Sequence, residues 1–219
     1  MNASPADRAS ALPQTPWPGP LSGHFQVGLL PLHAVLFPGG LMHLTVKDAR
    51  FRAWLSQCCA AGELVGIVAQ RAGTQEPEPV GVLAELLSAS TQAPDAVQLQ
   101  CRGWQRFHIK ATETLPDGRL QARIDLIEDD ATVAPSPGQH AAVKALATAM
   151  ASIKGQASDA TPRFLSPYRF DDAGWVANRW CEILPLNRQA KQRLMELPGG
   201  PARLELVDTF LRGQGVLPG

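Results

Sequence analysis

The sequence predicts an α+β fold in which a β-rich half is followed by a helical half. Apolar and polar residues alternate along several short segments in the first half, and beyond residue 135 apolar residues recur at helical spacing. Strands that precede helices along a chain are typical of an α+β architecture or of two packed subdomains. We therefore expect a flexible tail rich in proline and alanine over residues 1–25, a β-rich unit over residues 26–133 and a helical unit over residues 134–219.

The predicted strands are short and mostly amphipathic. Period-two alternation places one face of a strand in the core and the other in solvent, as where Val97, Leu99 and Cys101 alternate with glutamines. Because an open sheet leaves unpaired edges, we expect these antiparallel strands to curl into a barrel or a sandwich. The strand patterns cover residues 26–30, 41–46, 64–70, 80–87, 97–101, 106–111 and 120–126.

One helix is predicted inside the β-rich half. It begins at Asp48, and Phe51, Leu55 and Cys58 share one face before Gly62 ends it. The later helices are amphipathic and too short to be stable alone, so they must pack together and against the strands. Their expected start signals are Ser136-Pro137, Asp171 or Asp172, and Asn187, and the last helix runs to Gly213.

Composition indicates a folded chain of balanced charge. Hydrophobic residues make up 45 % of the 219 residues, which excludes wholesale disorder. Lysine plus arginine and aspartate plus glutamate both total 20, so the formal net charge is zero. A dedicated nucleic-acid binder usually carries a basic excess, so nucleic acid is the less favoured class of partner.

The cysteines and the chain start point to a reducing compartment. Cys58, Cys59, Cys101 and Cys181 contain no Cys-x-x-Cys pair, so we expect buried free thiols. The first 25 residues have no continuous apolar run and are not a signal peptide. Four prolines surround Trp17 there, and this side chain either docks on the folded part or is exposed. The apolar stretches fall short of a membrane span, so a cytoplasmic protein without a membrane partner is predicted.

No motif for catalysis or cofactor binding is present. The sequence has no GxxxxGK[ST] phosphate loop, and GxGxxG, GxSxG and HExxH are also missing. No two of the five histidines are spaced i, i+4 on a predicted helix, so a local metal pair is missing as well. We therefore expect a non-enzymatic protein with no cofactor and no metal.

Two groups of residues are candidates for a binding surface. Phe164, Tyr168, Phe170 and Trp175 surround one loop, where they either line a peptide groove or anchor the loop on the core. Basic residues with a neighbouring tryptophan follow two adjacent strands, where they form either an RNA-binding strip or an ordinary solvated face. The strip comprises Arg102, Trp104, Arg106 and Lys110, with His108, Arg119 and Arg123 nearby.

Six segments are similar, in order, to a known family. Residues 30–41 (LPLHAVLFPGGL) begin with Leu-Pro-Leu and continue into Leu-Phe-Pro-Gly, and residues 103–109 (GWQRFHI) follow a Gly-x-x-Arg-Phe-x-Ile pattern. This order resembles the N-terminal domain of Lon proteases over about residues 26 to 213. Asp48-Ala49 replaces the usual Glu-Pro, and Asp48 can still begin the helix as its N-cap. The remaining similar segments are 48–51, 65–71, 80–84 and 184–204.

The resemblance implies a PUA-like pseudo-β-barrel joined to a C-terminal helical bundle. It also implies a free-standing, non-catalytic module that recognises unfolded or degron-bearing polypeptides, because the chain lacks the ATPase and protease modules of full-length Lon. Such a module would act as an adaptor, with a separate protease or ATPase as a further partner. The alternative function is RNA binding, since PUA-like barrels also occur in RNA-modification proteins.

Overall fold

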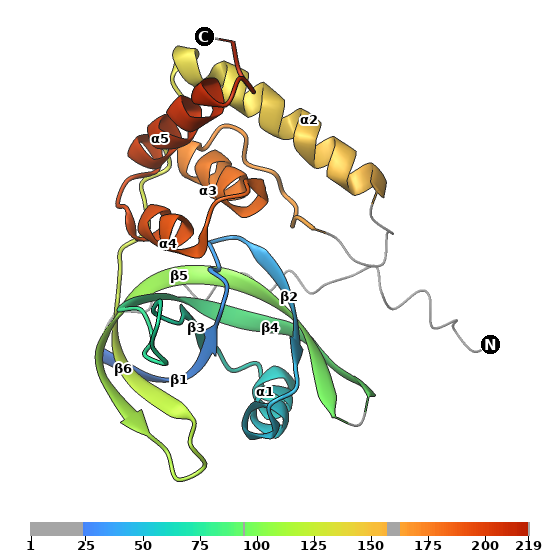
Figure 1. The fold of residues 1–219 in the computed structure, drawn as a ribbon, viewed down its shortest axis with the longest axis vertical. Helices are drawn as coiled ribbons and strands as arrows, with labels where there is room; N and C mark the ends of the chain where they lie inside the picture. The colour runs from blue at the N-terminus through green and yellow to red at the C-terminus, as the bar shows by residue number, and fades with distance from the viewer. Residues whose placement is uncertain (1–23, 94, 157–162, 219) are drawn as a thin grey trace, which may run out of the picture.

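The computed structural model describes residues 24–218, except residues 94 and 157–162. Figure 1 places the strands at one end of the molecule and helices α2 to α5 at the other, which confirms the α+β fold with C-terminal helices. Residues 1–23 of the tail expected over residues 1–25 lie outside the described residues. The last two residues of that range, His24 and Phe25, belong to the first strand.

The predicted helices are present, and the seven predicted strand segments correspond to six strands, some of them longer than predicted. The strands are β1 (His24–Leu32), β2 (Leu41–Val46), β3 (Val65–Ala69), β4 (Val80–Ala93), β5 (Ala96–Thr114) and β6 (Leu120–Leu126). The helices are α1 (Ala49–Ala61), the short η2 (Pro137–Gln139), α2 (His140–Gln156), α3 (Ala173–Ile183), α4 (Arg188–Glu196) and α5 (Gly200–Gly213).

Strand β5 organises the sheet. The strand order is β2-β5-β4-β3-β1-β6, and β6 pairs back onto β5, so five of the strands close into a barrel while β2 extends the sheet beside the first half of β5. The two strands expected at residues 97–101 and 106–111 are one strand of 19 residues. Alternation breaks between them because β5 carries one extra residue where its pairing shifts from Val82↔Arg106 to Ala84↔Gly103.

One pairing differs from the expected antiparallel arrangement. Strands β1 and β3 run parallel, from Leu29↔Gly66 to Leu32↔Ala69. A parallel pair needs a long crossover, and β2 and α1 supply it. Helix α1 begins as predicted, with the side chain of Asp48 accepting a hydrogen bond from the backbone N–H of Arg50, and ends at Gly62 in the left-handed region (φ 68°).

The hydrophobic core consists of two clusters, and the larger one is shared by the barrel and the helices. A smaller cluster around Leu29, Phe107 and Ile124 fills the barrel interior. The larger cluster runs from barrel residues such as Ile67 into the helical half, where Leu146 and Leu204 are fully buried. The two halves are therefore packed against each other. Within the described ranges, no helix combines the length and the apolar content that a bilayer crossing needs.

The turn between β1 and β2 is locked onto β5. The backbone N–H of Gly39 donates to the carbonyl of Gly103 (2.8 Å), and the N–H of Gly103 donates to the carbonyl of Gly40 (2.8 Å). A Cβ at Gly103 would overlap the carbonyl oxygen of Phe37, so only glycine permits this approach. The similarity segments 30–41 and 103–109 thus meet in space.

Gly103→Ala is expected to lower the free energy of unfolding by about 1–3 kcal/mol, because the added methyl group pushes the turn off β5. Urea unfolding followed by tryptophan fluorescence measures the change. The matched control is Gly213→Ala at the end of α5, where a Cβ meets no atom within 4 Å. Equal effects of the two substitutions would contradict the proposed role of Gly103.

Candidate functional site

A cleft lies where β5 passes beneath the helical half. It has a volume of about 480 Å³ and is bounded by the β1–β2 turn, by β5, by the segment after β6, and by the loop that leads into α3. The lining residues come from both halves of the molecule and include Pro38, Arg102, Trp104, Arg106, Asp129, Asp130, Thr132, Leu165, Pro167, Arg169, Trp175 and Asn178.

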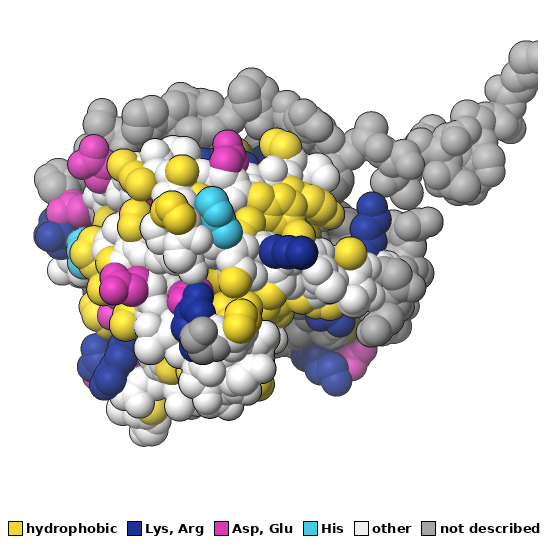
Figure 2. All heavy atoms as spheres, turned by 90° about the horizontal axis from the view of Figure 1, so that it is seen from above, with side chains coloured by type: hydrophobic (Ala, Val, Ile, Leu, Met, Phe, Trp, Pro, Cys, Tyr) yellow, Lys and Arg dark blue, Asp and Glu magenta, His cyan; other side chains and the backbone are white. Residues whose placement is uncertain are grey.

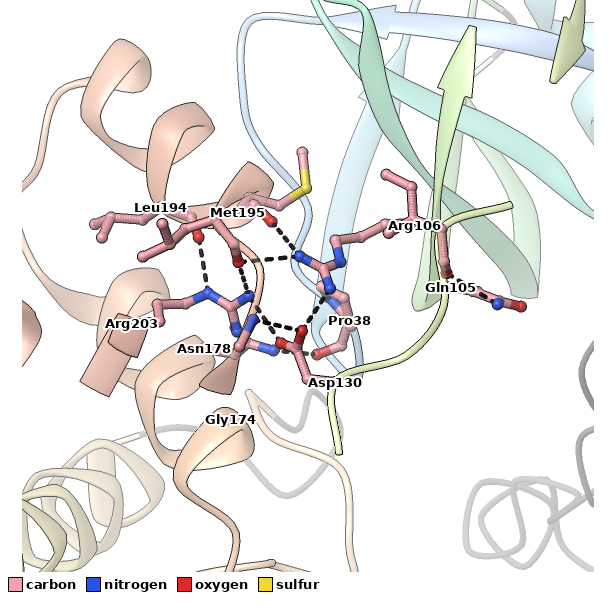
Figure 3. Close-up of polar contacts among 12 residues, drawn as sticks. Pro38, Gln105, Arg106, Asp130, Gly174, Asn178, Leu194, Met195 and Arg203 are labelled. Carbon is pink, nitrogen blue, oxygen red and sulfur yellow. Dashed lines mark hydrogen bonds and ion pairs between the residues drawn. The ribbon is translucent and has the colours of Figure 1, made fainter. Parts of the chain in front are cut away.

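The floor of the cleft is a buried polar network centred on Asp130 (Figure 3). Arg106 of β5 is only 3 % exposed, and its Nη2 lies 2.7 Å from Asp130 Oδ1. Arg203 of α5 is equally buried, and its Nη2 lies 2.9 Å from Asp130 Oδ2. One carboxylate therefore joins an arginine of the barrel to an arginine of the bundle.

The two arginines also donate to backbone carbonyls at the end of α4. Arg106 Nη1 donates to the carbonyls of Met195 (3.2 Å) and Leu197 (3.1 Å), at the end of α4. Arg203 Nε donates to the carbonyl of Leu194 (2.7 Å), and its Nη2 donates to that of Leu197 (2.6 Å). Both guanidinium groups therefore bind the C-terminal end of α4. This position favours cations, because the last carbonyls of a helix carry partial negative charge.

The charge of Asp130 is stabilised where it lies. Burial alone would raise the pKa of this carboxyl group. The backbone N–H of Gly199 (2.9 Å) and the guanidinium groups of Arg106 and Arg203 outweigh burial and lower the pKa. Neighbouring Asp129, which also lines the cleft, has its pKa raised by burial. The pKa values of the two adjacent carboxyl groups are thus shifted in opposite directions.

Helix α3 holds the β1–β2 turn at the edge of the cleft. Arg179 is buried and donates through Nη2 to the carbonyl of Pro38 (2.9 Å) and through Nη1 to that of Gly39. Its charge is paired with Glu182, at 2.7 Å. Asn178 connects this contact to the floor, because its Oδ1 accepts from Arg203 Nη1 (3.0 Å) and its Nδ2 donates to the carbonyl of Pro38 (3.4 Å).

Three of the four predicted aromatic residues form one cluster beside the cleft. Phe170 and Trp175 meet edge to face with ring centroids 5.3 Å apart, and Tyr168 packs on both. Trp175 lines the cleft itself, whereas Tyr168, which is 39 % exposed, packs on Trp175 and stands in sequence between the lining residues Pro167 and Arg169 without lining the cleft. Phe164 is buried in the main core. Phe164 therefore anchors the loop on the core, and of the four aromatic residues only Trp175, in the first turn of α3, lines the cleft.

The expected solvated basic strip is interrupted at Arg106, which is buried between barrel and bundle and cannot meet a phosphate group. Other members of the strip are paired with carboxylates: Arg102 with Glu85 (2.5 Å), Lys110 with Asp125 (3.0 Å) and Arg119 with Asp117 (2.6 Å). Figure 2 views the molecule from its helical end, where lysine and arginine side chains are scattered among hydrophobic ones. His108 and Arg123 are exposed.

The structure joins the two candidate surfaces into one. Arg102 and Trp104 from the predicted strip line the same cleft as Trp175 from the predicted groove. Arg102 stacks over the Trp104 ring, 4.2 Å from its centroid, and the indole N–H donates to Glu85 (3.1 Å). The cleft therefore combines aromatic surfaces with charges that are already neutralised.

The sequence reasoning missed the residues that position the cleft. Asn178 and Arg179 stand in a helix whose other residues from 173 to 181 are also buried, and Arg203 adjoins buried Leu204. Polar residues at such positions are a usable signal, because a buried charge needs a partner. The partner Asp130 has no such signal, since it lies in a segment without a periodic pattern.

The buried thiols are poorly suited to covalent chemistry. All four cysteines are free, and burial raises the pKa of Cys101 and of Cys181 to about 12 and that of Cys58 to about 11. A thiol with such a pKa is protonated near neutral pH and is a weak nucleophile and metal ligand. Within the described part of the chain, no three histidine, cysteine or acidic side chains are grouped to hold a metal ion.

Comparison with known proteins gives this architecture a family. The model of the ATP-dependent protease La (LON) substrate-binding domain matches residues 26–213. The chain belongs to this Lon substrate-binding domain family. A family so described is a non-catalytic module for substrate recognition, and the match spans both the barrel and the helices that enclose the cleft.

Solved structures agree with the family at the level of the fold. A Lon N-terminal domain protein from Xanthomonas campestris is 23 % identical with a TM-score of 0.65, and covers 84 % of this chain and 96 % of its own. The N-terminal domain of the Mycobacterium avium complex Lon protease is 17 % identical with a TM-score of 0.58 and the same coverage of 84 % and 96 %. No curated protein is significantly similar in sequence.

Asp130→Asn is expected to lower the free energy of unfolding at pH 7 by roughly 3–5 kcal/mol, because it leaves two buried arginines without a counter-charge. The lowered pKa means that the carboxylate stabilises the fold above its unfolded-state pKa and loses this effect as pH falls through the folded-state value. The difference between the wild type and the variant should therefore shrink in acid.

Urea unfolding across a pH series measures this difference. Asp117→Asn is the matched control, since Asp117 also pairs with an arginine but is exposed on the β5–β6 turn. Little change is expected there. A pH-independent difference for Asp130→Asn would show that its charge is not what stabilises the fold.

Proposed function

We propose that this chain is a non-catalytic adaptor that binds segments of unfolded or degron-bearing polypeptides in the cleft between barrel and bundle. Membership of the Lon substrate-binding domain family is the observation that carries the proposal. An adaptor of this kind would deliver its polypeptide to a separate ATP-dependent protease. The four free cysteines suit a reducing cytoplasm as the place where it acts.

The chemistry of the cleft suits polypeptide better than a charged small molecule. Trp104 and Trp175 line it, and Tyr168, which is 39 % exposed, packs on Trp175 next to the lining residues Pro167 and Arg169. Aromatic side chains of this kind dominate the energetics of polypeptide interfaces. Asp129 and Thr132 lie beside them and can accept hydrogen bonds from backbone N–H groups of a bound segment.

RNA binding is the weaker alternative. It depends on cations that are free to neutralise phosphates, and the cations of the cleft are paired: Arg102 with Glu85, Arg106 with Asp130, and Arg169 with Asp172. An RNA ligand would have to break such pairs. It would also show the steep loss of affinity with rising salt that phosphate contacts produce.

Tyr168→Ala is expected to weaken binding of a permanently unfolded polypeptide about 5- to 10-fold, because an interface aromatic residue contributes more than about 1 kcal/mol. Fluorescence anisotropy with labelled, reduced and carboxymethylated α-lactalbumin measures the affinity. Leu206→Ala is the matched control: Leu206 is 54 % exposed and lies on α5, and neither it nor its sequence neighbours line the cleft, whereas both neighbours of Tyr168 do.

The same titrations at low and high salt separate the two functions. Salt-tolerant binding that is weakened by Tyr168→Ala and unchanged by Leu206→Ala supports polypeptide recognition in the cleft. Equal affinities of the two variants for the polypeptide would show that the polypeptide does not bind in the cleft. Tight, salt-sensitive binding of a labelled RNA hairpin, with no binding of the polypeptide, would establish the alternative.

A further inference from the structure

Strand β2 forms an open edge of the sheet. The strand order places β2 outermost, and among the described residues it pairs with β5 alone. It runs from the helical half towards α1 (Figure 1). An open edge presents unpaired backbone N–H and C=O groups, which can pair with a further strand. The edge of β2 is therefore a candidate interaction surface of a different kind from the cleft.

The register with β5 identifies the backbone groups that point outwards. The N–H of Gly103 donates to the carbonyl of Gly40, and the pairing of β2 with β5 then continues without a shift to the end of β2. In an antiparallel pair, residues that bond to the neighbouring strand alternate with residues that do not. The N–H and C=O groups of Leu41, His43 and Thr45 therefore face away from β5.

This edge lacks the features that usually protect an open strand. Natural edge strands carry charged residues, prolines or bulges that prevent pairing with other chains. The six residues of β2 include no Lys, Arg, Asp, Glu or Pro, and their register with β5 contains no bulge. Lys47 comes only after the strand has ended. His43 and Thr45 are exposed, so a further strand can approach them.

An extended polypeptide is the occupant that fits this edge. Its own N–H and C=O groups can pair with those of Leu41, His43 and Thr45 whatever its side chains are. The edge also begins beside the cleft, since Gly39 lines the cleft and β2 starts two residues later. A second copy of β2 fits less well, because six residues on each side fall far short of the roughly 20–30 of a stable interface.

The two faces of β2 determine which side chains the added strand prefers. Met42 and Leu44 are half-buried against the larger hydrophobic cluster, whereas His43 and Thr45 on the opposite face are exposed. Paired residues of neighbouring strands place their side chains on the same face. Every second residue of the added strand therefore lies on the face of Met42 and Leu44 and is preferably apolar, and the residues between can be polar.

We propose that an extended segment of the bound polypeptide pairs with the outer edge of β2, as a further strand that continues from the cleft. The inference rests on the proposed polypeptide recognition and deepens it. It assigns the mode of binding, through the backbone of the polypeptide, and it selects segments in which apolar and polar residues alternate.

Thr45→Pro tests the edge while leaving the bonds to β5 in place. Proline removes the N–H that points away from β5, and proline is tolerated on edge strands. Binding of labelled, reduced and carboxymethylated α-lactalbumin should weaken about tenfold, because a carbonyl of the polypeptide loses its donor. Thr45→Val keeps the N–H and is the matched control, so it should bind as the wild type does.

Amide hydrogen exchange of the wild type, followed residue by residue by NMR, tests the pairing without any variant. Before the polypeptide is added, the amides of Leu41, His43 and Thr45 should exchange fast and those of Met42 and Leu44 slowly. Saturating carboxymethylated α-lactalbumin should slow exchange of the first three by at least about tenfold, because strand pairing protects amides from solvent. The other two should not change.

The outcomes separate this proposal from the recognition function. Polypeptide binding with unchanged exchange at the three outward amides, and with equal affinities of Thr45→Pro and Thr45→Val, overturns the β2 proposal and keeps the recognition function. Slow exchange of these amides before polypeptide is added shows that the edge is already covered and also overturns the proposal; a dependence on protein concentration would identify a second copy as the cover. Failure of the wild type to bind the polypeptide at any salt concentration overturns the recognition function and the proposal together.

Discussion

One half-buried carboxylate, Asp130, sets the relation between the two halves of this molecule. It lies on the segment that leaves the barrel and pairs with Arg106 of β5 and with Arg203 of α5. It also accepts the backbone N–H of Gly199, just before α5 begins. The segment after β6, the strand below it and the last helix are therefore fixed to one point, and the cleft lies directly beside that point.

Such a network adds more to specificity than to net stability. The free energy needed to desolvate two guanidinium groups and a carboxylate offsets much of the free energy gained from their attraction. The donors of Arg106 and Arg203 reach the last carbonyls of α4 only when that helix ends at one place. Arg179 fixes the β1–β2 turn in the same way, by donating to the backbone carbonyl of Pro38. A cleft held in this way is ordered before it binds, which lowers the entropy lost on association.

Much of the fold could be predicted, because local patterns there agree with the tertiary structure. Helix α1 begins at Asp48 and ends at Gly62 as its capping residues indicate. The site was harder to predict because period-two alternation identifies a polar face of a strand without showing what covers it. Arg106 lies on such a face of β5 and was expected in solvent, but the end of α4 covers it. Long-range burial of a charge depends on partners such as Asp130 that no local pattern connects to it.

Site-specific photo-crosslinking tests the central claim, that polypeptide binds between barrel and bundle. Thr132 is exposed and lines the cleft, so a benzoylphenylalanine placed there should crosslink to bound unfolded polypeptide and map it to the cleft. The same photoprobe at Leu206 on α5 should give little product. Efficient crosslinking from position 132 alone is the predicted result. Crosslinking from position 206 with none from position 132 would place the polypeptide elsewhere and contradict the account.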